Sequence, residues 1–389
     1  MKRGFTLIEI VVTVAVVTIL LAMILPYLPR VFQESRKPTL SDLENIKLGI
    51  MGEPTKVANK VRTSFGYFGD MGRLPSSLQD LLIQGSQPGY AYNQDLRVGA
   101  GWRGPYLRAL EGNPGQFKPD AYGNAYIYDT TQYMSADTGG LVIGKIVSPG
   151  ADLTANTSDD LKIEIFKSEA FGQISGLVKD QDFNYVPNVK VTINYPNNGI
   201  LSSLQTVTDS NGRYVFSDIP FGNRSITIEP QLVYKSKSAY TKGGGTDLFL
   251  QVTNYATNAI TINSLTAVYS SDPVAYFEEV LIGGVSLWRF QNFGNVRAAS
   301  GQTIPFSSSK TLAGTNLPNE TLMVSVHEPT IVLTDRVIGR FNQGQTITVR
   351  IRGFKDAQTG AGAGVDITGV PFQITFSDGS VASFIPVKG

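Results

Sequence analysis

The chain has 389 residues, which is more than one hydrophobic core normally organises, so two to four domains are expected. Its 33 basic residues (Lys and Arg) are balanced by 32 acidic ones, and a net charge of +1 provides no basic surface for nucleic acid. The chain has no cysteine and one histidine, His327, which excludes disulfides, thiol nucleophiles and multi-histidine metal cages.

An apolar segment without any charged residue runs from Ile10 to Pro29. At about 1.5 Å per residue, a helix of that length would cross the roughly 30 Å hydrocarbon core of a bilayer. Lys2 and Arg3 precede the segment and should stay on the cytoplasmic side, so we expect the remainder of the chain to be exported. An ordinary secretory signal would be shorter and would end in a small-residue cleavage site.

Glu9 places an acid at the head of this segment, where a carboxylate is costly unless it has a partner or reaches water. The surrounding residues 4–9, GFTLIE, resemble the prepilin cleavage motif. The resemblance implies that a prepilin peptidase cuts after Gly4, that Phe5 becomes a methylated N-terminus, and that Glu9 meets the terminal amine of a neighbouring subunit. Pro26 resembles the proline at which pilin helices unwind locally on assembly, in keeping with its missing N–H. A plain membrane anchor with a snorkelling glutamate is the alternative.

A second helix is predicted after Pro38, where apolar residues recur at helical spacing and Ser41 with Glu44 forms a capping-box pattern. A short helix is predicted at residues 75–82. Farther on, Gly, Pro and Asp separate short apolar runs, which indicates a small sheet with long ordered loops.

Three turn-rich phrases, at residues 101–107, 120–126 and 148–152, resemble those of the major pseudopilin of type II secretion. The resemblance spans about residues 1 to 166, although Pro29 and Pro38 interrupt what is usually one long helix. It implies an α+β pilin-like domain with an N-terminal transmembrane or filament-core helix. The expected division is a leader at 1–4, the hydrophobic helix at 5–30 and the globular domain at 31–171.

The loop at residues 150–160 is rich in Asp, Asn and Thr. Ca²⁺ takes six to eight oxygen ligands, which an irregular loop can supply, but this loop lacks the glycine and the glutamate of an EF-hand. Its spacing resembles the calcium loop of the major pseudopilin, which implies a Ca²⁺ site at Asp152, Asp159 and Asp160. The alternative is an Asx-turn loop whose carboxylates cap backbone N–H groups.

Beyond Phe171 apolar and polar residues alternate, which is typical of half-buried antiparallel strands. Residues 172–232 resemble the carboxypeptidase regulatory-like domain, a transthyretin-like β-sandwich without a peptidase site. Residues 233–389 are interpreted, from the pattern alone, as an immunoglobulin-like β domain. The fold class predicted for the chain is therefore an α+β pilin-like domain followed by two all-β sandwich domains.

Catalysis is not expected, because His327 lies in an alternating run, and the adjacent acids Glu278 and Glu279 would face opposite sides of a strand as ordinary solvated charges. The predicted function is that of a structural subunit of a type IV pilus or type II secretion pseudopilus. Such a subunit packs with copies of itself or related pilins in a helical filament. It would lie in the inner membrane before assembly and in an extracellular or periplasmic filament afterwards. The alternative is a low-copy minor or tip pilin that acts as an adhesin or substrate-binding module.

Overall fold

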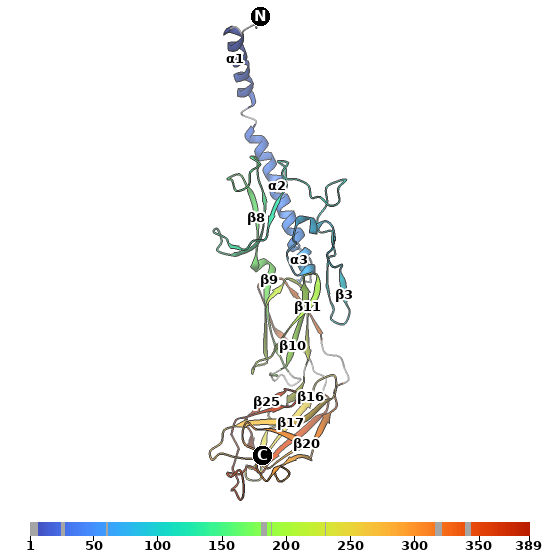
Figure 1. Ribbon diagram of the computed structural model, residues 1–389, viewed down its shortest axis with the longest axis vertical. Coiled ribbons are helices and arrows are strands. Elements are labelled where there is room, and N and C mark those ends of the chain that lie inside the picture. Colours follow the sequence, from blue (N-terminus) through green and yellow to red (C-terminus); the bar gives the residue numbers. More distant parts are fainter. Residues whose placement is uncertain are drawn as a thin grey trace.

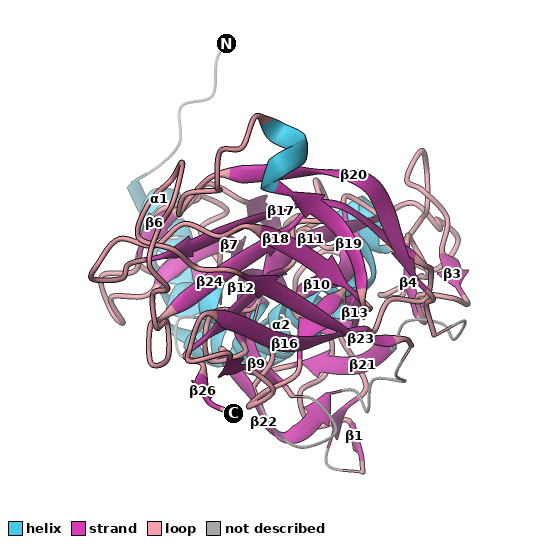
Figure 2. Ribbon diagram, turned by 90° about the horizontal axis from the view of Figure 1, so that it is seen from below, coloured by secondary structure: helices cyan, strands magenta, loops and turns pink. Residues whose placement is uncertain are grey.

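The computed structural model describes residues 7–24, 28–59, 61–179, 185–187, 189–229, 231–315, 321–338 and 344–389. The molecule is elongated and has three parts along its axis: helices with a small sheet, a middle β-sandwich, and a larger β-sandwich at the C-terminal end (Figure 1). Seen from that end, strands make up most of the molecule and the long N-terminal helices lie behind them (Figure 2).

The N-terminal part begins with helix α1 (Leu7–Ile24) and helix α2 (Leu28–Met51). Helix α1 has 18 residues. Among the residues with described positions, no helix combines the length and the apolarity that a membrane crossing requires.

Helix α2 corrects the predicted start near Ser41, because it begins at Leu28 and continues through Pro38. Proline removes one backbone hydrogen bond from a helix interior. The hydroxyl of the next residue, Thr39, donates to the Ser35 carbonyl at 2.9 Å, so this turn retains a side-chain bond along the helix. Burial of the following turns against the sheet then outweighs the local helix-breaking signal.

The sheet beneath α2 is antiparallel, with β7 paired to β5, β6 and β8. Leu43, Ile46 and Ile50 of α2 are buried in the core that they share with Ile146 and Ile165 of this sheet. The helix expected at residues 75–82 is a short 3₁₀ helix. The remaining elements of this part are β1 (Val57–Ala58), β2 (Val61–Arg62), α3 (Gly66–Met71), η1 (Leu78–Leu81), β3 (Ala91–Asn93), β4 (Val98–Ala100), β5 (Ile127–Asp129), β6 (Tyr133–Met134), β7 (Leu141–Ser148), β8 (Leu161–Phe166) and α4 (Lys167–Ala170).

The middle sandwich stacks a sheet of order β11-β10-β13-β21 on a sheet of order β12-β9-β22. Its strands are β9 (Phe171–Val178), β10 (Lys190–Asn197), β11 (Ile200–Val207), β12 (Arg213–Pro220), β13 (Gly222–Glu229), β21 (Thr321–Val326) and β22 (Thr330–Ile338). The alternation of apolar and polar residues predicted beyond Phe171 includes β10 and β13, so strand character is confirmed there.

Strands β21 and β22 correct the predicted boundary between residues 232 and 233, because they belong to the middle sandwich and not to the C-terminal one. β21 pairs antiparallel with β13, and β22 pairs parallel with β9. In Figure 1 they are the orange strands among the green ones. The physical reason is burial: Val324 and Val326 join the core formed by Ile174 and Ile226. The chain therefore crosses between the two sandwiches three times, after β13, after β20 and after β22.

The C-terminal sandwich stacks a seven-stranded sheet, β19-β18-β23-β16-β15-β26 with β14 also on β16, on a four-stranded sheet, β20-β17-β24-β25. A hairpin turn at residues 377–380 joins β24 to β25. The elements are β14 (Leu232–Tyr234), β15 (Tyr240–Lys242), β16 (Asp247–Asn254), β17 (Ile260–Tyr269), β18 (Glu279–Ile282), β19 (Val285–Arg289), η2 (Phe290–Phe293), β20 (Thr303–Leu312), β23 (Thr346–Arg352), β24 (Phe372–Phe376), β25 (Val381–Phe384) and β26 (Val387–Lys388).

Candidate functional site

Helix α1 exposes apolar side chains around its whole circumference. Leu7 is 83% exposed, and Val17, the least exposed of its large apolar side chains, is still 47% exposed. A helix that is apolar on every side is stable only where lipid or other helices cover it. Glu9 lies in the first turn of this helix. The other three predicted residues of this site, Gly4, Phe5 and Pro26, lie outside the described residues.

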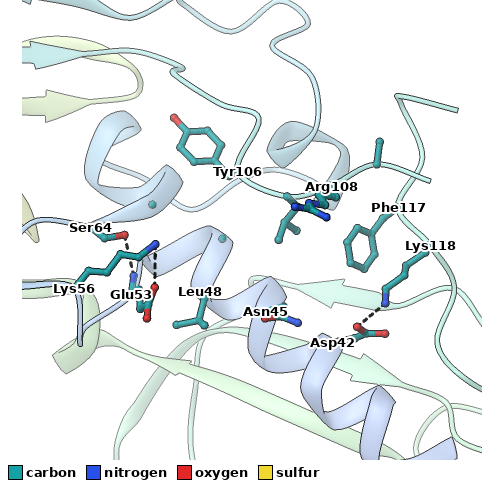
Figure 3. A pocket seen from close by; sticks show the side chains of 14 residues that line it. Asp42, Asn45, Leu48, Glu53, Lys56, Ser64, Tyr106, Arg108, Phe117 and Lys118 are labelled. Atoms are coloured by element: carbon teal, nitrogen blue, oxygen red, sulfur yellow. Dashed lines mark hydrogen bonds and ion pairs between the residues drawn. The ribbon is translucent and has the colours of Figure 1, made fainter. Parts of the chain in front are cut away.

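A cleft of about 630 Å³ lies between α2 and the segment at residues 106–118 (Figure 3). Asp42 and Leu48 belong to its α2 wall, and Lys118 of the opposite wall pairs with Asp42 at 2.7 Å. Glu53, the other acid that lines the cleft, pairs with Lys56 at 3.1 Å. In a single copy of the chain, this cleft leaves one side of α2 accessible.

The turn phrases at residues 120–126 and 148–152 meet at Asp120, which is buried. Its carboxylate accepts the N–H groups of Tyr122 and Asn124 at 3.0 and 2.7 Å, and also the hydroxyl of Ser148. The Asn124 side-chain amide donates to the Gly150 carbonyl at 2.7 Å. These bonds give the phrases an architectural role centred on Asp120, a residue that the sequence analysis did not single out.

The three aspartates of the candidate calcium loop bind the backbone of their own loop. The Asp159 carboxylate accepts the N–H groups of Ala151 and Asp152 at 2.7 and 3.1 Å and the Thr157 hydroxyl at 2.7 Å. The Thr157 hydroxyl, followed by the Asp152 N–H, lowers the pKa of Asp159. Asp152 and Asp160 each accept one loop N–H, at 2.8 and 2.7 Å.

In this arrangement one carboxylate oxygen of each of the three aspartates accepts backbone N–H groups of the loop. Within the described ranges, no group of three or more His, Cys, Asp or Glu side chains is placed to hold a metal. The geometry is that of the Asx-turn alternative. Calcium binding at Asp152, Asp159 and Asp160 stays a prediction that rests on their spacing.

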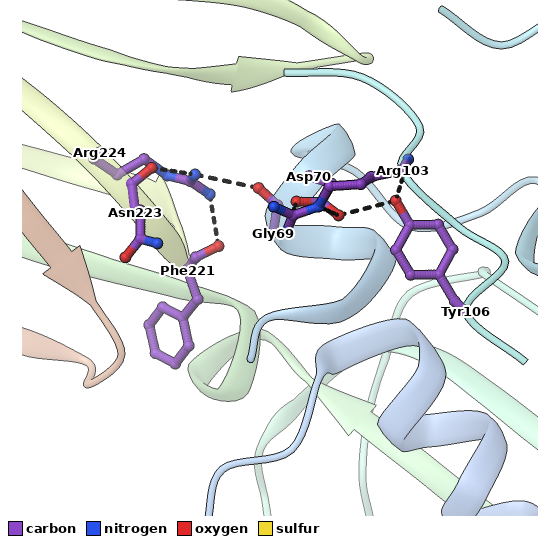
Figure 4. Close-up of polar contacts among 7 residues, drawn as sticks. All are labelled: Gly69, Asp70, Arg103, Tyr106, Phe221, Asn223 and Arg224. Atoms are coloured by element: carbon purple, nitrogen blue, oxygen red, sulfur yellow. Dashed lines mark hydrogen bonds and ion pairs between the residues drawn. The ribbon is translucent and has the colours of Figure 1, made fainter. Parts of the chain in front are cut away.

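Arg224 of β13 lies at the joint between the N-terminal part and the middle sandwich (Figure 4). The residue is only 1% exposed. Its guanidinium donates to the carbonyls of Pro220 at 2.8 Å, Phe221 at 2.6 Å and Asn223 at 2.9 Å, and, across the joint, to the carbonyl of Gly69 in α3 at 3.2 Å. One arginine thus ties the sandwich to the helical part through backbone groups alone.

Asp70 lies beside this bond in α3 and is itself buried. Its carboxylate pairs with Arg103 at 2.9 Å and accepts the Tyr106 hydroxyl at 3.0 Å. Burial raises the pKa of Asp70, and the Arg103 charge acts in the opposite direction. Burial lowers the pKa of Arg224, while the Asp70 charge raises it. No sequence signal separates Arg224 from an ordinary strand arginine, so this joint was not predicted.

The acids Glu278 and Glu279 correct the expectation of solvated charges. Glu279 is 4% exposed and pairs with Arg289 and Arg352, and Glu278 pairs with Arg297 at 2.8 Å. His327 lies 2.9 Å, through Nδ1, from the backbone carbonyl of Ser325. Each of these side chains has a structural partner.

Residues 1–25 match the prokaryotic N-terminal methylation motif, and residues 173–253 match the carboxypeptidase regulatory-like domain. The chain thus combines a type IV prepilin motif with all-β domains, so the resemblances to the prepilin motif and to the carboxypeptidase regulatory-like domain are confirmed. The resemblance of residues 1 to 166 to the major pseudopilin of type II secretion stays a prediction. The two matches together cover less than half of the chain.

Among solved structures, the chain is similar to the full-length major pilin SpaD of Corynebacterium diphtheriae, with 10% identity, a TM-score of 0.22, and coverage of 56% of this chain and 64% of that chain. It is also similar to the major pilin subunit BcpA of Bacillus cereus, with 8% identity, a TM-score of 0.14, and coverage of 55% and 67%. The chain therefore spans less than two thirds of SpaD, and a likeness at these scores carries no functional argument. A search of curated protein sequences gives no significant match.

Proposed function

We propose that this chain is a structural subunit of a pilus-type filament, in which α1 packs with the corresponding helices of other copies or related pilins. The observation that carries the proposal is the apolar surface of α1 behind a methylation motif at residues 1–25. Before assembly, the same surface would be covered by the inner membrane, where a prepilin peptidase would process the chain between Gly4 and Phe5.

The energy available from covering α1 supports this assignment. Twelve large apolar side chains of α1 are at least 47% exposed. At about 1.5 to 3 kcal/mol for each side chain that becomes fully buried, their burial stabilises an assembly by on the order of 10 to 30 kcal/mol. Lipid offers a similar environment, so specific contacts must favour the filament over the membrane. Glu9, paired with the amine of a neighbouring Phe5, is the contact that we propose.

The elongated shape supports the second half of the proposal, the display of the two sandwiches on the filament surface. The C-terminal sandwich lies at the end of the molecule opposite α1, and the middle sandwich lies between it and the helical part (Figure 1). A filament of this kind would be extracellular or periplasmic, as a type IV pilus or a type II secretion pseudopilus. Calcium binding by Asp152, Asp159 and Asp160 in the loop at residues 150–160 is a separate proposal, which rests on the spacing of these residues.

The test compares Glu9→Ala with Glu44→Ala, which removes an exposed acid from α2. Removing an acid eases burial of α1 in lipid but deletes the partner of a neighbour's amine. We expect both variants in the membrane fraction in wild-type amounts, and only Glu9→Ala to yield few filaments. Wild-type filament yield from Glu9→Ala would contradict the proposal.

Intact mass of assembled material should show a chain that begins at methylated Phe5. The amount of this chain along the filament distinguishes the two alternatives: a main subunit occurs along the whole length, whereas a tip adhesin is rare and terminal.

A further inference from the structure

A second cleft, of about 400 Å³, lies where the N-terminal part meets the middle sandwich. One wall comes from the C-terminal half of α2 with β8 and α4, and the other comes from the turn between β21 and β22. Small-molecule sites typically enclose about 300 to 1,000 Å³. The apolar side chains that line this cleft are Leu48, Met51, Ile163, Phe221 and Pro329.

Arg62 lines the cleft as a buried cation, 7% exposed. Its Nε donates to the Ser64 carbonyl at 2.7 Å, and its Nη2 donates to the carbonyl of Met51 at the end of α2 at 2.5 Å. These bonds use two of the five N–H donors of a guanidinium. In the described part of the chain no carboxylate pairs with Arg62, and burial lowers its pKa.

The other charges of the cleft do not neutralise Arg62. Lys47 is paired with Glu169 at 2.8 Å. Glu44 lies at the exposed mouth, where water and salt screen its charge. The interior of the cleft therefore combines an apolar lining with one buried cation that still has hydrogen-bond donors. An anion that reaches such a cation binds favourably, because the cation has already lost its hydration when the chain folded.

We propose that this cleft binds an aliphatic carboxylate, with the headgroup on Arg62 and the hydrocarbon chain against Met51 and Phe221. The planar guanidinium matches a carboxylate in a bidentate geometry. The apolar lining favours a ligand with a hydrocarbon body over a bare inorganic anion. Because the two walls belong to different parts of the molecule, a bound carboxylate contacts both and holds the joint closed. This site is independent of filament assembly.

The experiment titrates the full chain, in nonionic detergent, with hexanoate, with hexanamide and with inorganic phosphate. The readout is the ring NMR signal of His327, which lines the cleft and is the only histidine in the chain. We expect a saturable shift with hexanoate and at least tenfold weaker binding of hexanamide and phosphate. Equal binding of hexanamide, equal binding of phosphate, or no shift with hexanoate would each overturn the proposal.

Variants locate the ligand. Arg62→Met should weaken hexanoate binding at least tenfold. Because Arg62 also bonds the end of α2, a second variant leaves it in place: Ser168→Trp adds bulk at the exposed mouth and should block binding. Lys56→Met, which removes an exposed cation outside this cleft, is the matched control and should bind as wild type. Wild-type affinity in folded Arg62→Met, or in Ser168→Trp, would refute the site.

Discussion

Replacing Arg224 by methionine tests the joint between the N-terminal part and the middle sandwich. Methionine keeps the unbranched stem but removes the donors that four backbone carbonyls accept. Hydrogen bonds to a charged donor contribute about 1.5 to 3 kcal/mol each, so four of them would sum to roughly 6 to 12 kcal/mol. Removing a desolvated charge offsets several kcal/mol of that sum. We expect a net loss of about 3 kcal/mol in the free energy of local unfolding that exposes the turn between β12 and β13 together with its contact to α3, because three of the four acceptors lie in that turn and the fourth is Gly69.

Hydrogen exchange followed by mass spectrometry measures this loss locally. About 3 kcal/mol corresponds to a roughly hundredfold fall in amide protection, which we expect in α3 and at the start of β13. The matched control is Arg213→Met on β12, where the arginine is exposed and the change should stay within about 0.5 kcal/mol. Equal protection in Arg224→Met and in the control would refute the reasoning, because it would show that the four carbonyls do not depend on the guanidinium.

Three further predictions concern the loop, the sandwich and the acid at the joint. If calcium binds the folded loop, it should raise the melting temperature of the chain, and Asp159→Ala should abolish the rise; identical curves with calcium and with chelator would exclude the site. Deleting residues 233–389 removes β21 and β22, so amide protection in β9 and β13 should collapse, and retained protection would contradict the strand assignment. Because burial raises the pKa of Asp70 above 3.8, the folded state holds a proton more tightly than the unfolded state, and stability falls as pH rises above that value. Asp70→Asn should remove this component, measured as urea midpoints between pH 4 and 7, whereas an unchanged pH dependence would contradict it.

Local pattern was enough to predict strands and much of helix α2. Leu43, Ile46 and Ile50 recur at helical spacing and are buried, and the alternation in β10 and β13 marks real strands. Partnership between distant strands was not predictable, because the alternation in β21 is the same whichever sandwich buries it. For that reason the assignment of all of residues 233–389 to one domain was wrong, although the chain does enter the C-terminal sandwich at β14.

The candidate sites also differ in whether the local sequence or the contacts between distant segments determine them. The motif around Glu9 is a contiguous phrase, so it was recognised from sequence and matches the methylation motif. The direction in which Asp159 points depends on backbone N–H groups eight and seven residues away, which spacing alone does not reveal. The burial of Arg224 and Arg62 depends on how two parts of the molecule meet. Neither arginine differs in its local sequence from a solvated one.

The triple crossing between the sandwiches sets an order on folding, which matters if the chain is exported as we propose. β9 pairs with β22 through partners as distant in sequence as Gln173 and Thr330. Pairing across such a separation carries a loop-closure cost before the contacts form, which makes it slow. A chain that leaves the membrane from its N-terminal side presents β9 and β13 with open edges until residues up to Ile338 have followed. The middle sandwich is therefore the part that most needs protection from pairing with other chains on the way to its final position.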